Sequence, residues 1–340
     1  MAIPLAVVVI IRRMLFLLSL LLAALQNWKT LLGGSFVTVL GVLSDTDFAK
    51  NSRLRLLLSK PIEKFKLGIG MPLILKKELA NEIRLSILDG SCGVKILWTP
   101  QGGGKSTTVR EVVSNLQLEN AIAGALIISP PDNNNIFPSE WFRQALVDMR
   151  GPLLGDHEKL SKRLPAIRNG KLFVFVLDQL ENCQLNEDLK CFIKTLAEDS
   201  DRVKSYVIIA ITSDAVMATT MWEWNGRQKI TLMGDDGLDF STYKWSEVEV
   251  KEWLQKYQPK NNAVEKLLAE DSELFESLSS SAVSAGTPGF LAFNVPKETS
   301  DIKKVDQKGR WSEKAKYYSD QWKSGLDFIR KERNRTNFPA

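Results

Sequence analysis

A glycine-rich turn that ends in Lys-Ser carries the clearest chemical signal in the sequence. It runs from Gly102 to Ser106, between an apolar run at 94–98 and an amphipathic stretch at 107–118. Successive glycines allow positive φ angles and bring bare backbone N–H groups against an anion, and the dipole of a following helix points at the same place. Strand, glycine turn and helix together predict a phosphate-binding loop. In such a loop Lys105 reaches the β- and γ-phosphates, and the Ser106 hydroxyl ligates Mg²⁺.

One position departs from the loop pattern G-x-x-x-x-G-K-[ST], because Thr99 stands where the first glycine is expected. Three consecutive glycines later in the turn can supply the sharp backbone bend instead. The plain alternative is a glycine-rich turn between a strand and a helix that ends in Gly-Lys-Ser by chance. The predicted nucleotide contacts come from the loop and the first turn of its helix: Pro100, Gln101, Gly102, Gly103, Gly104, Lys105, Ser106 and Thr107.

A second apolar run, 172–177, has the composition of a strand buried on both faces of a parallel sheet. Asp178 follows it directly, and a carboxylate at the end of a strand beside a phosphate loop is placed to hold Mg²⁺. Ser106 and Asp178 are therefore the predicted metal ligands. The next residue, Gln179, carries an amide that can orient water but cannot take its proton. Glu181 is the nearby carboxylate that we expect to accept this proton. The alternative is a strand that simply ends in Asp at a turn.

A third apolar run ends in hydroxyl residues. Thr212 at its end suits a sensor of the γ-phosphate or of the attacking water, whereas Ser213 or Asp214 could equally cap a following helix. Arg202 and Arg227 are further candidates for a contact with the γ-phosphate. The predicted catalytic residues are Lys105, Asp178, Gln179, Glu181 and Thr212.

Composition excludes several other kinds of site. Three cysteines in 340 residues are too few and too scattered for a disulfide framework or a zinc site. His157 is the only histidine, which argues against a histidine metal centre or a Ser-His-Asp triad. The net charge of +5 is mildly basic and gives weak support for nucleic acid or anionic lipid as a partner.

The first 44 residues contain no acidic residue and are mostly apolar. Arg12 and Arg13 would cost about 2.5 to 3.5 kcal/mol each at the centre of a bilayer, so the best spanning segment begins after them and ends near Leu32. Its length is close to the ~20 residues that a bilayer needs. Basic residues are more numerous on its C-terminal side, which predicts a single-pass membrane anchor with the rest of the chain in the cytoplasm or an equivalent ATP-containing compartment. A cleaved signal peptide is the competing interpretation.

The remaining chain divides into four parts by its patterns. After a linker at 45–75, strands alternate with helices over 76–233, which predicts an α/β three-layer sandwich with a parallel sheet. Residues 234–295 are helical in pattern and predict a small lid. A polar, basic tail follows at 296–340, and its aromatic residues at helical spacing could dock on the preceding domain or contact a partner or nucleic acid.

Taken in order, these motifs resemble a known family. The Gly-Lys-Ser loop, the strand followed by Asp178-Gln179-Leu180-Glu181, the Thr212 strand end and a helical region with Gly286-Thr287-Pro288 are similar to the STAND and AAA+ branch of P-loop ATPases. The resemblance covers about 76–291. It implies a P-loop NTPase fold with ATP and Mg²⁺ as cofactors, Pro288 near the adenine, and Asp-Gln-x-Glu as a variant of the magnesium-binding pattern.

The sequence also departs from that family. Asp214 stands where such proteins often carry an arginine after the hydroxyl strand end, and the chain has no internal repeat, whereas STAND proteins usually carry a repeat array. We therefore expect a membrane-anchored ATP-binding protein, a hydrolase that uses Mg-ATP binding and hydrolysis as a conformational switch. A nucleotide-binding scaffold with little hydrolysis, favoured by Thr99 and Gln179, and a nucleic-acid-associated ATPase stay open as alternatives. The sequence also leaves open a protein partner or a homo-oligomer.

Overall fold

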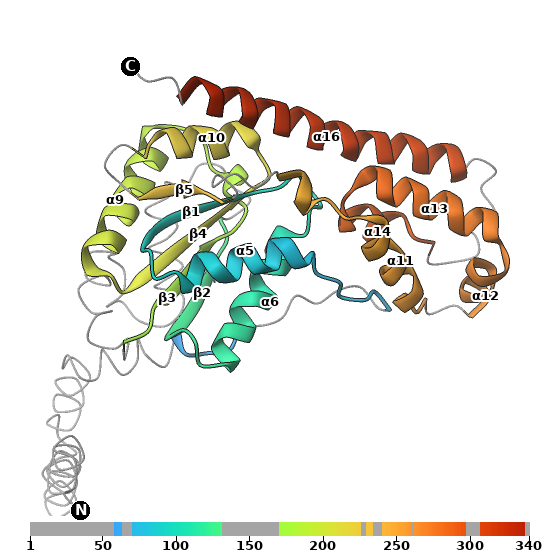
Figure 1. Ribbon diagram of the computed structural model, residues 1–340, viewed down its shortest axis with the longest axis horizontal. Helices are drawn as coiled ribbons and strands as arrows, with labels where there is room; N and C mark the ends of the chain where they lie inside the picture. Colours follow the sequence, from blue (N-terminus) through green and yellow to red (C-terminus); the bar gives the residue numbers. More distant parts are fainter. Residues whose placement is uncertain are drawn as a thin grey trace, which may run out of the picture. The chain divides into compact units, whose positions relative to one another are not determined.

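The computed structural model describes seven stretches of the chain, and Figure 1 shows their arrangement. The predicted membrane segment at 1–44 lies outside them, as do the helices that the sequence predicts near Ser139 and over 156–169. Within the described stretches, no helix combines the length and the apolar character that crossing a membrane requires. The described residues are 58–62, 70–130, 170–225, 229–233, 240–259, 262–296 and 307–336.

The described strands form one parallel sheet, in the order β2-β3-β4-β1-β5 (Figure 1). Every residue of β1, β3 and β4 is buried, as expected for central strands of a sheet that is covered on both faces. The apolar runs of the sequence therefore mark the strands correctly, and the predicted parallel α/β architecture is confirmed. The strands are β1 Gly93–Trp98, β2 Gly124–Ile128, β3 Phe173–Leu177, β4 Tyr206–Thr212 and β5 Ile230–Leu232.

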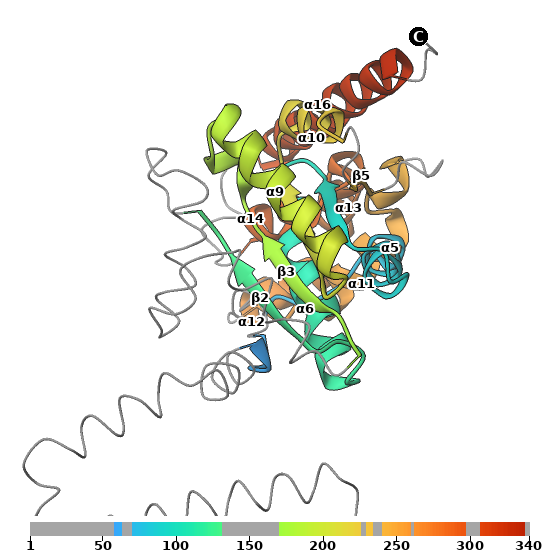
Figure 2. The same cartoon turned by 90° about the vertical axis from the view of Figure 1, so that its left-hand side faces the viewer.

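Helices cover the two faces of the sheet. The helices α5 and α6 pack against each other on one face, and α9 and α10 lie on the opposite face (Figure 2). Right-handed crossovers between parallel strands require this division. The helices are α5 Lys77–Leu88, α6 Lys105–Leu118, α9 Glu187–Val203 and α10 Ala215–Glu223.

The register of the sheet brings three chain segments to one edge. The last residue of β1, Trp98, pairs with Thr212 of β4, and the last residue of β3, Leu177, pairs with Ala210. The glycine loop, Asp178 and the end of β4 therefore emerge side by side. This carboxyl edge is where open parallel sheets bind ligands.

Four helices form a second lobe beside that edge. Ser246 and Glu249 cap the start of α11 with the reciprocal side-chain bonds that their spacing predicts. Gly286, at φ 66°, ends α13 in the left-handed conformation, and Pro288 then opens α14 in its first turn. The helices are α11 Glu247–Lys256, α12 Asn262–Glu270, α13 Ser272–Ala285 and α14 Pro288–Asn294.

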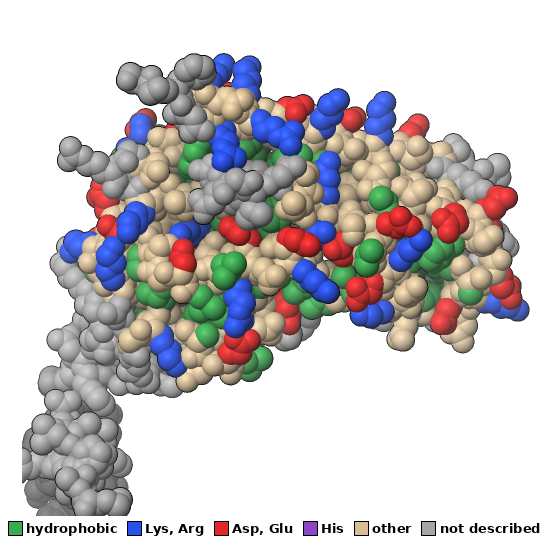
Figure 3. Space-filling view, in the orientation of Figure 1, with side chains coloured by type: hydrophobic (Ala, Val, Ile, Leu, Met, Phe, Trp, Pro, Cys, Tyr) green, Lys and Arg blue, Asp and Glu red, His purple; other side chains and the backbone are tan. Residues whose placement is uncertain are grey.

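The helix α16, Gln307–Thr336, lies within the tail that the sequence indicates at 296–340 and runs along both lobes (Figure 1). Near its start Trp311 is buried in the apolar core of the second lobe. Further along, Trp322 packs edge-on against Trp98 at the end of β1, with 5.8 Å between ring centroids. Figure 3 shows Lys and Arg side chains along the outer edge of this helix. The exposed basic residues of α16 include Arg310, Lys316, Lys323, Arg330 and Lys331.

A close contact fixes α16 against the sheet. A Cβ added at Gly325 would lie 2.2 Å from Cζ2 and 2.7 Å from Cη2 of the buried Trp98 ring. Helix propensity alone favours Gly325→Ala by about 1 kcal/mol. Overpacking of a filled core costs about 1 to 3 kcal/mol, so the clash should win. We expect Gly325→Ala to lower the Tm by several degrees in a thermal melt.

The exposed neighbour Ser324 supplies the matched control. Ser324→Ala should change the stability by no more than about 0.5 kcal/mol, because substitutions at exposed positions away from special features have small effects. A Gly325→Ala variant that melts at or above the wild-type temperature would show that α16 does not press on Trp98.

Candidate nucleotide-binding site

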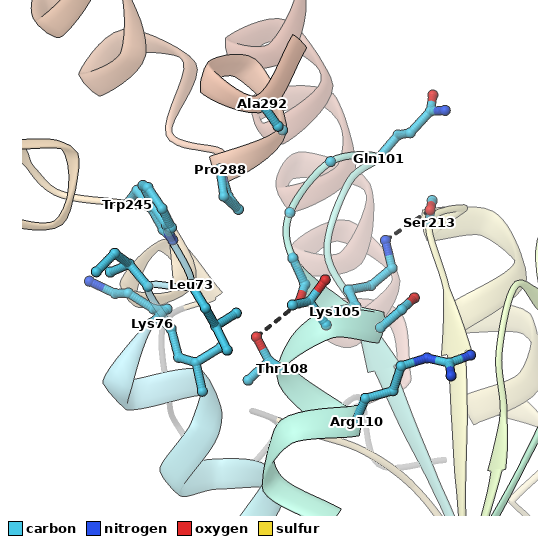
Figure 4. Close-up of a pocket in the computed structure, with 18 of the residues that line it drawn as sticks. Leu73, Lys76, Gln101, Lys105, Thr108, Arg110, Ser213, Trp245, Pro288 and Ala292 are labelled. Carbon is cyan, nitrogen blue, oxygen red and sulfur yellow. Dashed lines mark hydrogen bonds between the residues drawn. The ribbon is translucent and has the colours of Figure 1, made fainter. Parts of the chain in front are cut away.

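A cavity of about 570 Å³ lies at the carboxyl edge of the sheet, between the glycine loop and the second lobe. Its two ends differ in character (Figure 4). Lys105 and Ser213 lie at a polar end, whereas Leu73 and Trp245 lie on the opposite side and Pro288 stands between the two. A cavity with one polar and one apolar end suits a ligand that has a charged part and a flat, weakly polar part.

The glycine loop adopts the conformation that its composition predicts. Gly102 and Gly104 have φ angles of 77° and 82°, which are unfavourable for residues with a side chain, and Gly104 is the N-cap of α6. Gly103 serves a different purpose, because a Cβ there would lie 2.2 Å from Thr99 Oγ1. Thr99, at the position of the missing first glycine, is thus accommodated under the loop.

The Lys105 side chain is folded back into the loop. Its Nζ donates hydrogen bonds to the carbonyl oxygens of Thr99 at 2.7 Å and Pro100 at 3.2 Å, and to Ser213 Oγ at 2.8 Å. These acceptors hold the amine at the polar end of the cavity. An incoming phosphate would be a stronger acceptor than any of them.

Burial lowers the pKa of Lys105 to about 8, although the nearby charges of Glu181 and Asp178 act to raise it. The amine therefore carries its charge at neutral pH and begins to lose it in mildly alkaline solution. A bound polyphosphate would raise the pKa again, because an opposite charge favours the charged form.

Ser106 and Asp178 meet directly. Ser106 Oγ donates a 2.6 Å hydrogen bond to Asp178 Oδ1, and the carboxylate is buried. A hydroxyl and a carboxylate are the oxygen ligands that Mg²⁺ prefers, and Mg²⁺ usually takes its other ligands from water and substrate phosphates. Two side-chain ligands are thus sufficient, although the described residues hold no cluster of three or more His, Cys, Asp or Glu. The donor set fits Mg²⁺.

Glu181 is fixed beside the loop by the end of β4. Its two carboxylate oxygens accept hydrogen bonds from Ser213, one from the backbone N–H at 3.1 Å and one from Oγ at 2.8 Å. Ser213 Oγ thus links Lys105 to Glu181. Gln179 lines the same cavity and has φ 61°, a left-handed conformation that is strained for a residue other than glycine.

The predicted sensor Thr212 does not face the cavity, and Ser213 does. Thr212 is fully buried, and its Oγ1 accepts a hydrogen bond from the backbone N–H of Asp214. Asp214 in turn caps α10 by accepting from Val216 N at 2.8 Å. Adjacent residues of a strand point to opposite faces, so a shift of one position changes which hydroxyl reaches the site.

The two arginine candidates are not brought to the cavity by the described structure. Arg202 pairs with Asp199 on α9, and Arg227 lies outside the described residues. Pro100 holds its carbonyl toward Lys105, and Gln101 and Thr107 line the cavity.

Sequence reasoning missed much of the cavity wall, including Arg110, the segment 71–76, and Trp245 with Trp253. Arg110 could have been found, because it follows Ser106 by one helical turn and so shares its face. The other two carry no local signal, since they reach the cavity only through the packing of the two lobes.

The second lobe touches the glycine loop directly. Gly289 N donates a hydrogen bond to Gly102 O at 2.9 Å, and a Cβ added at Gly104 would lie 3.1 Å from Pro288 Cγ. A second contact joins the two lobes, because Lys76 Nζ, just before α5, donates a hydrogen bond to Glu249 Oε1 of α11 at 3.0 Å. Pro288 thus lines the cavity and packs on the loop itself.

No protein-family model matches the sequence, and neither does any curated protein. Similar solved structures include a Walker-type ATPase of Pyrococcus abyssi, with 13% identity and a TM-score of 0.46 over 77% of each chain. Cdc6p of Pyrobaculum aerophilum is 12% identical, with a TM-score of 0.41 over 70% of this chain and 63% of its own. AMPPCP-bound DnaA of Aquifex aeolicus is 13% identical, with a TM-score of 0.33 over 79% of this chain and 85% of its own.

These similar structures are P-loop ATPases, and they do not single out the STAND type. The scores are too low to carry a functional argument. The assignment of the cavity rests on its own geometry.

Proposed function

We propose that the protein binds ATP in this cavity and hydrolyses it with the help of Mg²⁺. The observation that carries the proposal is the 2.6 Å bond between Ser106 and Asp178, which joins the glycine loop to the end of a different strand. A glycine-rich turn that arose by chance would not require a buried carboxylate opposite its serine. Magnesium, when bound, would supply a Lewis acid that polarises the phosphate oxygens.

The shape of the cavity supports a nucleoside triphosphate as the ligand. Its volume of about 570 Å³ lies within the usual range for cofactor sites, ~300 to 1,000 Å³. The phosphates would lie along the loop near Lys105, and the base would lie at the apolar end near Leu73 and Trp245. Pro288 would separate these two regions.

The contacts between the lobes support a conformational switch. The loop contacts α14 through the Gly102–Gly289 bond, and α16 rests on the end of β1 through Trp322. A phosphate that enters the loop would lie beside the first of these contacts, because Gly102 and Gly289 line the cavity. Elements that a γ-phosphate holds in one state and releases after hydrolysis are a common basis for such switches.

We propose Glu181 as the acceptor of the proton of the attacking water, and Glu181→Gln tests this role. Glutamine keeps the shape of the side chain and can still accept the Ser213 N–H bond. We expect phosphate release at saturating ATP to fall about 100- to 10,000-fold, with little change in ATP affinity. The exposed carboxylate of Glu187 on α9 is the control, and Glu187→Gln should leave turnover unchanged.

Three outcomes discriminate among the alternatives. Unchanged turnover in Glu181→Gln would rule out Glu181 as the base. Wild-type protein that binds ATP tightly but releases no phosphate would favour the nucleotide-binding scaffold. Hydrolysis that DNA or RNA stimulates with a steep salt dependence would favour the nucleic-acid-associated ATPase.

We also propose that residues 14–32 anchor the protein in a membrane, with the ATPase domain on the ATP-containing side. The proposal is supported by the apolar composition of that segment, by the position of Arg12 and Arg13 at one end, and by the basic residues that follow it. The full-length protein should stay with membranes during alkaline carbonate extraction. Release into the supernatant would contradict the anchor, and an intact mass that lacks the segment would indicate a cleaved signal peptide.

A further inference from the structure

Arg110 lies where the metal ligands meet. It follows Ser106 by one turn of α6, and both residues contact the same carboxylate. Ser106 Oγ donates to Asp178 Oδ1, and Arg110 Nη2 lies 3.8 Å from Asp178 Oδ2. One helix thus places a hydrogen bond on one oxygen of the predicted magnesium ligand and a permanent positive charge near the other.

The arginine is only partly satisfied by this contact. Its Nε atom is buried and has no hydrogen-bond partner, and its side chain is 27% exposed and lines the cavity. A buried N–H without an acceptor is costly, and a phosphate oxygen would be a strong acceptor for it. Figure 4 shows Arg110 extending from α6 on the same side of the cavity as Lys105.

We propose that Arg110 shares Asp178 with the divalent cation and carries part of the charge neutralisation of the bound polyphosphate. Nucleotide would therefore bind with little dependence on Mg²⁺. This inference rests on the proposed nucleotide site and concerns the balance of charge within it.

Charge balance supports the inference in two ways. Asp178 is already paired with a cation, so its attraction for Mg²⁺ is reduced, and a Mg²⁺ ion at Ser106 would also experience repulsion from the guanidinium. Free ATP carries more negative charge than Mg-ATP, and it would meet Lys105 and Arg110 in the cavity wall, whereas the third lining cation, Lys76, is paired with Glu78 and Glu249. Both effects shift the preference of the site from Mg-ATP toward free ATP.

The test is a calorimetric titration of the full-length protein with ATP, once with excess MgCl2 and once with excess EDTA. The measured quantity is the ratio of the two Kd values. In the wild type we expect this ratio to stay within about threefold. In Arg110→Gln we expect the EDTA Kd to rise and the ratio to grow by about tenfold or more, because a hydrogen-bonded charge has been lost.

Matched variants distinguish an effect of the lost charge on ATP binding from a loss of the folded state. Arg110→Lys keeps the charge on a shorter side chain and should give an intermediate ratio. Arg84→Gln removes an exposed arginine that pairs with Glu119, and it should leave the ratio at its wild-type value. Thermal melts establish that each variant is folded.

The outcomes distinguish this inference from the function on which it rests. Wild-type protein that binds ATP tightly with Mg²⁺ but about 100-fold more weakly in EDTA overturns the inference and leaves the nucleotide site intact. This result decides the matter even if Arg110→Gln does not fold. Equal ratios in wild type and Arg110→Gln also overturn it, whereas a wild type that binds ATP in neither buffer contradicts the proposed function itself.

Discussion

Lys105→Ala is expected to weaken ATP binding by about 100-fold or more, or about 3 kcal/mol. The amine is buried at the polar end of the cavity, and it is bonded to two loop carbonyls and to Ser213. Alanine removes the charge that would meet the phosphates and the 2.7 Å hydrogen bond to Thr99 O, whereas Pro100 O keeps the hydrogen bond from Gly103 N. Isothermal titration with ATP measures the loss directly.

The control is Lys190→Ala, which removes an exposed lysine that pairs with Glu187 on α9. It should bind ATP as the wild type does. If Lys105→Ala binds ATP with unchanged affinity, the glycine loop does not hold phosphate.

The pH profile provides a second readout of the same amine. Free protein has a Lys105 pKa of about 8, and bound phosphate would raise it, so binding above this pH takes up a proton. ATP affinity should therefore stay constant below the free-state pKa and fall as the pH rises above it, by up to about tenfold per unit. The same titration of Lys105→Ala should show no such fall.

Gly103→Ala is expected to disrupt the loop and weaken ATP binding by about 10- to 100-fold. Its backbone φ is not positive, so conformational freedom does not explain the glycine. The reason is space, because an added Cβ would lie 2.2 Å from Thr99 Oγ1, 2.8 Å from Thr99 Cβ and 3.0 Å from Pro100 O. Overpacking of this kind costs about 1 to 3 kcal/mol, and here it acts on the phosphate contacts.

A double-mutant cycle tests this explanation. Thr99→Gly removes two of the three crowding atoms and also removes a buried hydroxyl that has no hydrogen-bond partner. Thr99→Gly combined with Gly103→Ala should recover much of the affinity, and the coupling energy should be clearly favourable. A double variant that binds no better than Gly103→Ala alone would mean that Thr99 is not the obstacle.

Much of the fold could be predicted from the sequence, because the decisive signals are local. Continuous apolar runs mark strands that are buried on both faces, and Ser246 with Glu249 marks a helix start through bonds that span three residues. The apolar runs 94–98 and 172–177 differ by one residue from β1 and β3. The glycine loop with Lys105 and the strand end at Asp178 could also be predicted from the sequence, because turn conformation and strand burial depend on residues close together in the chain.

The sequence by itself thus determined the glycine loop, the carboxylate that follows β3 and the alternation of strands and helices. The tertiary structure decided which hydroxyl reaches the site, because the pairing of β1 with β4 buries Thr212 and turns Ser213 into the cavity. It also brought Arg110 within 3.8 Å of Asp178 and formed the hydrogen bond from Gly289 to Gly102 of the loop. Such contacts join residues that are far apart in the chain, and their distances follow from packing and register rather than from any local pattern.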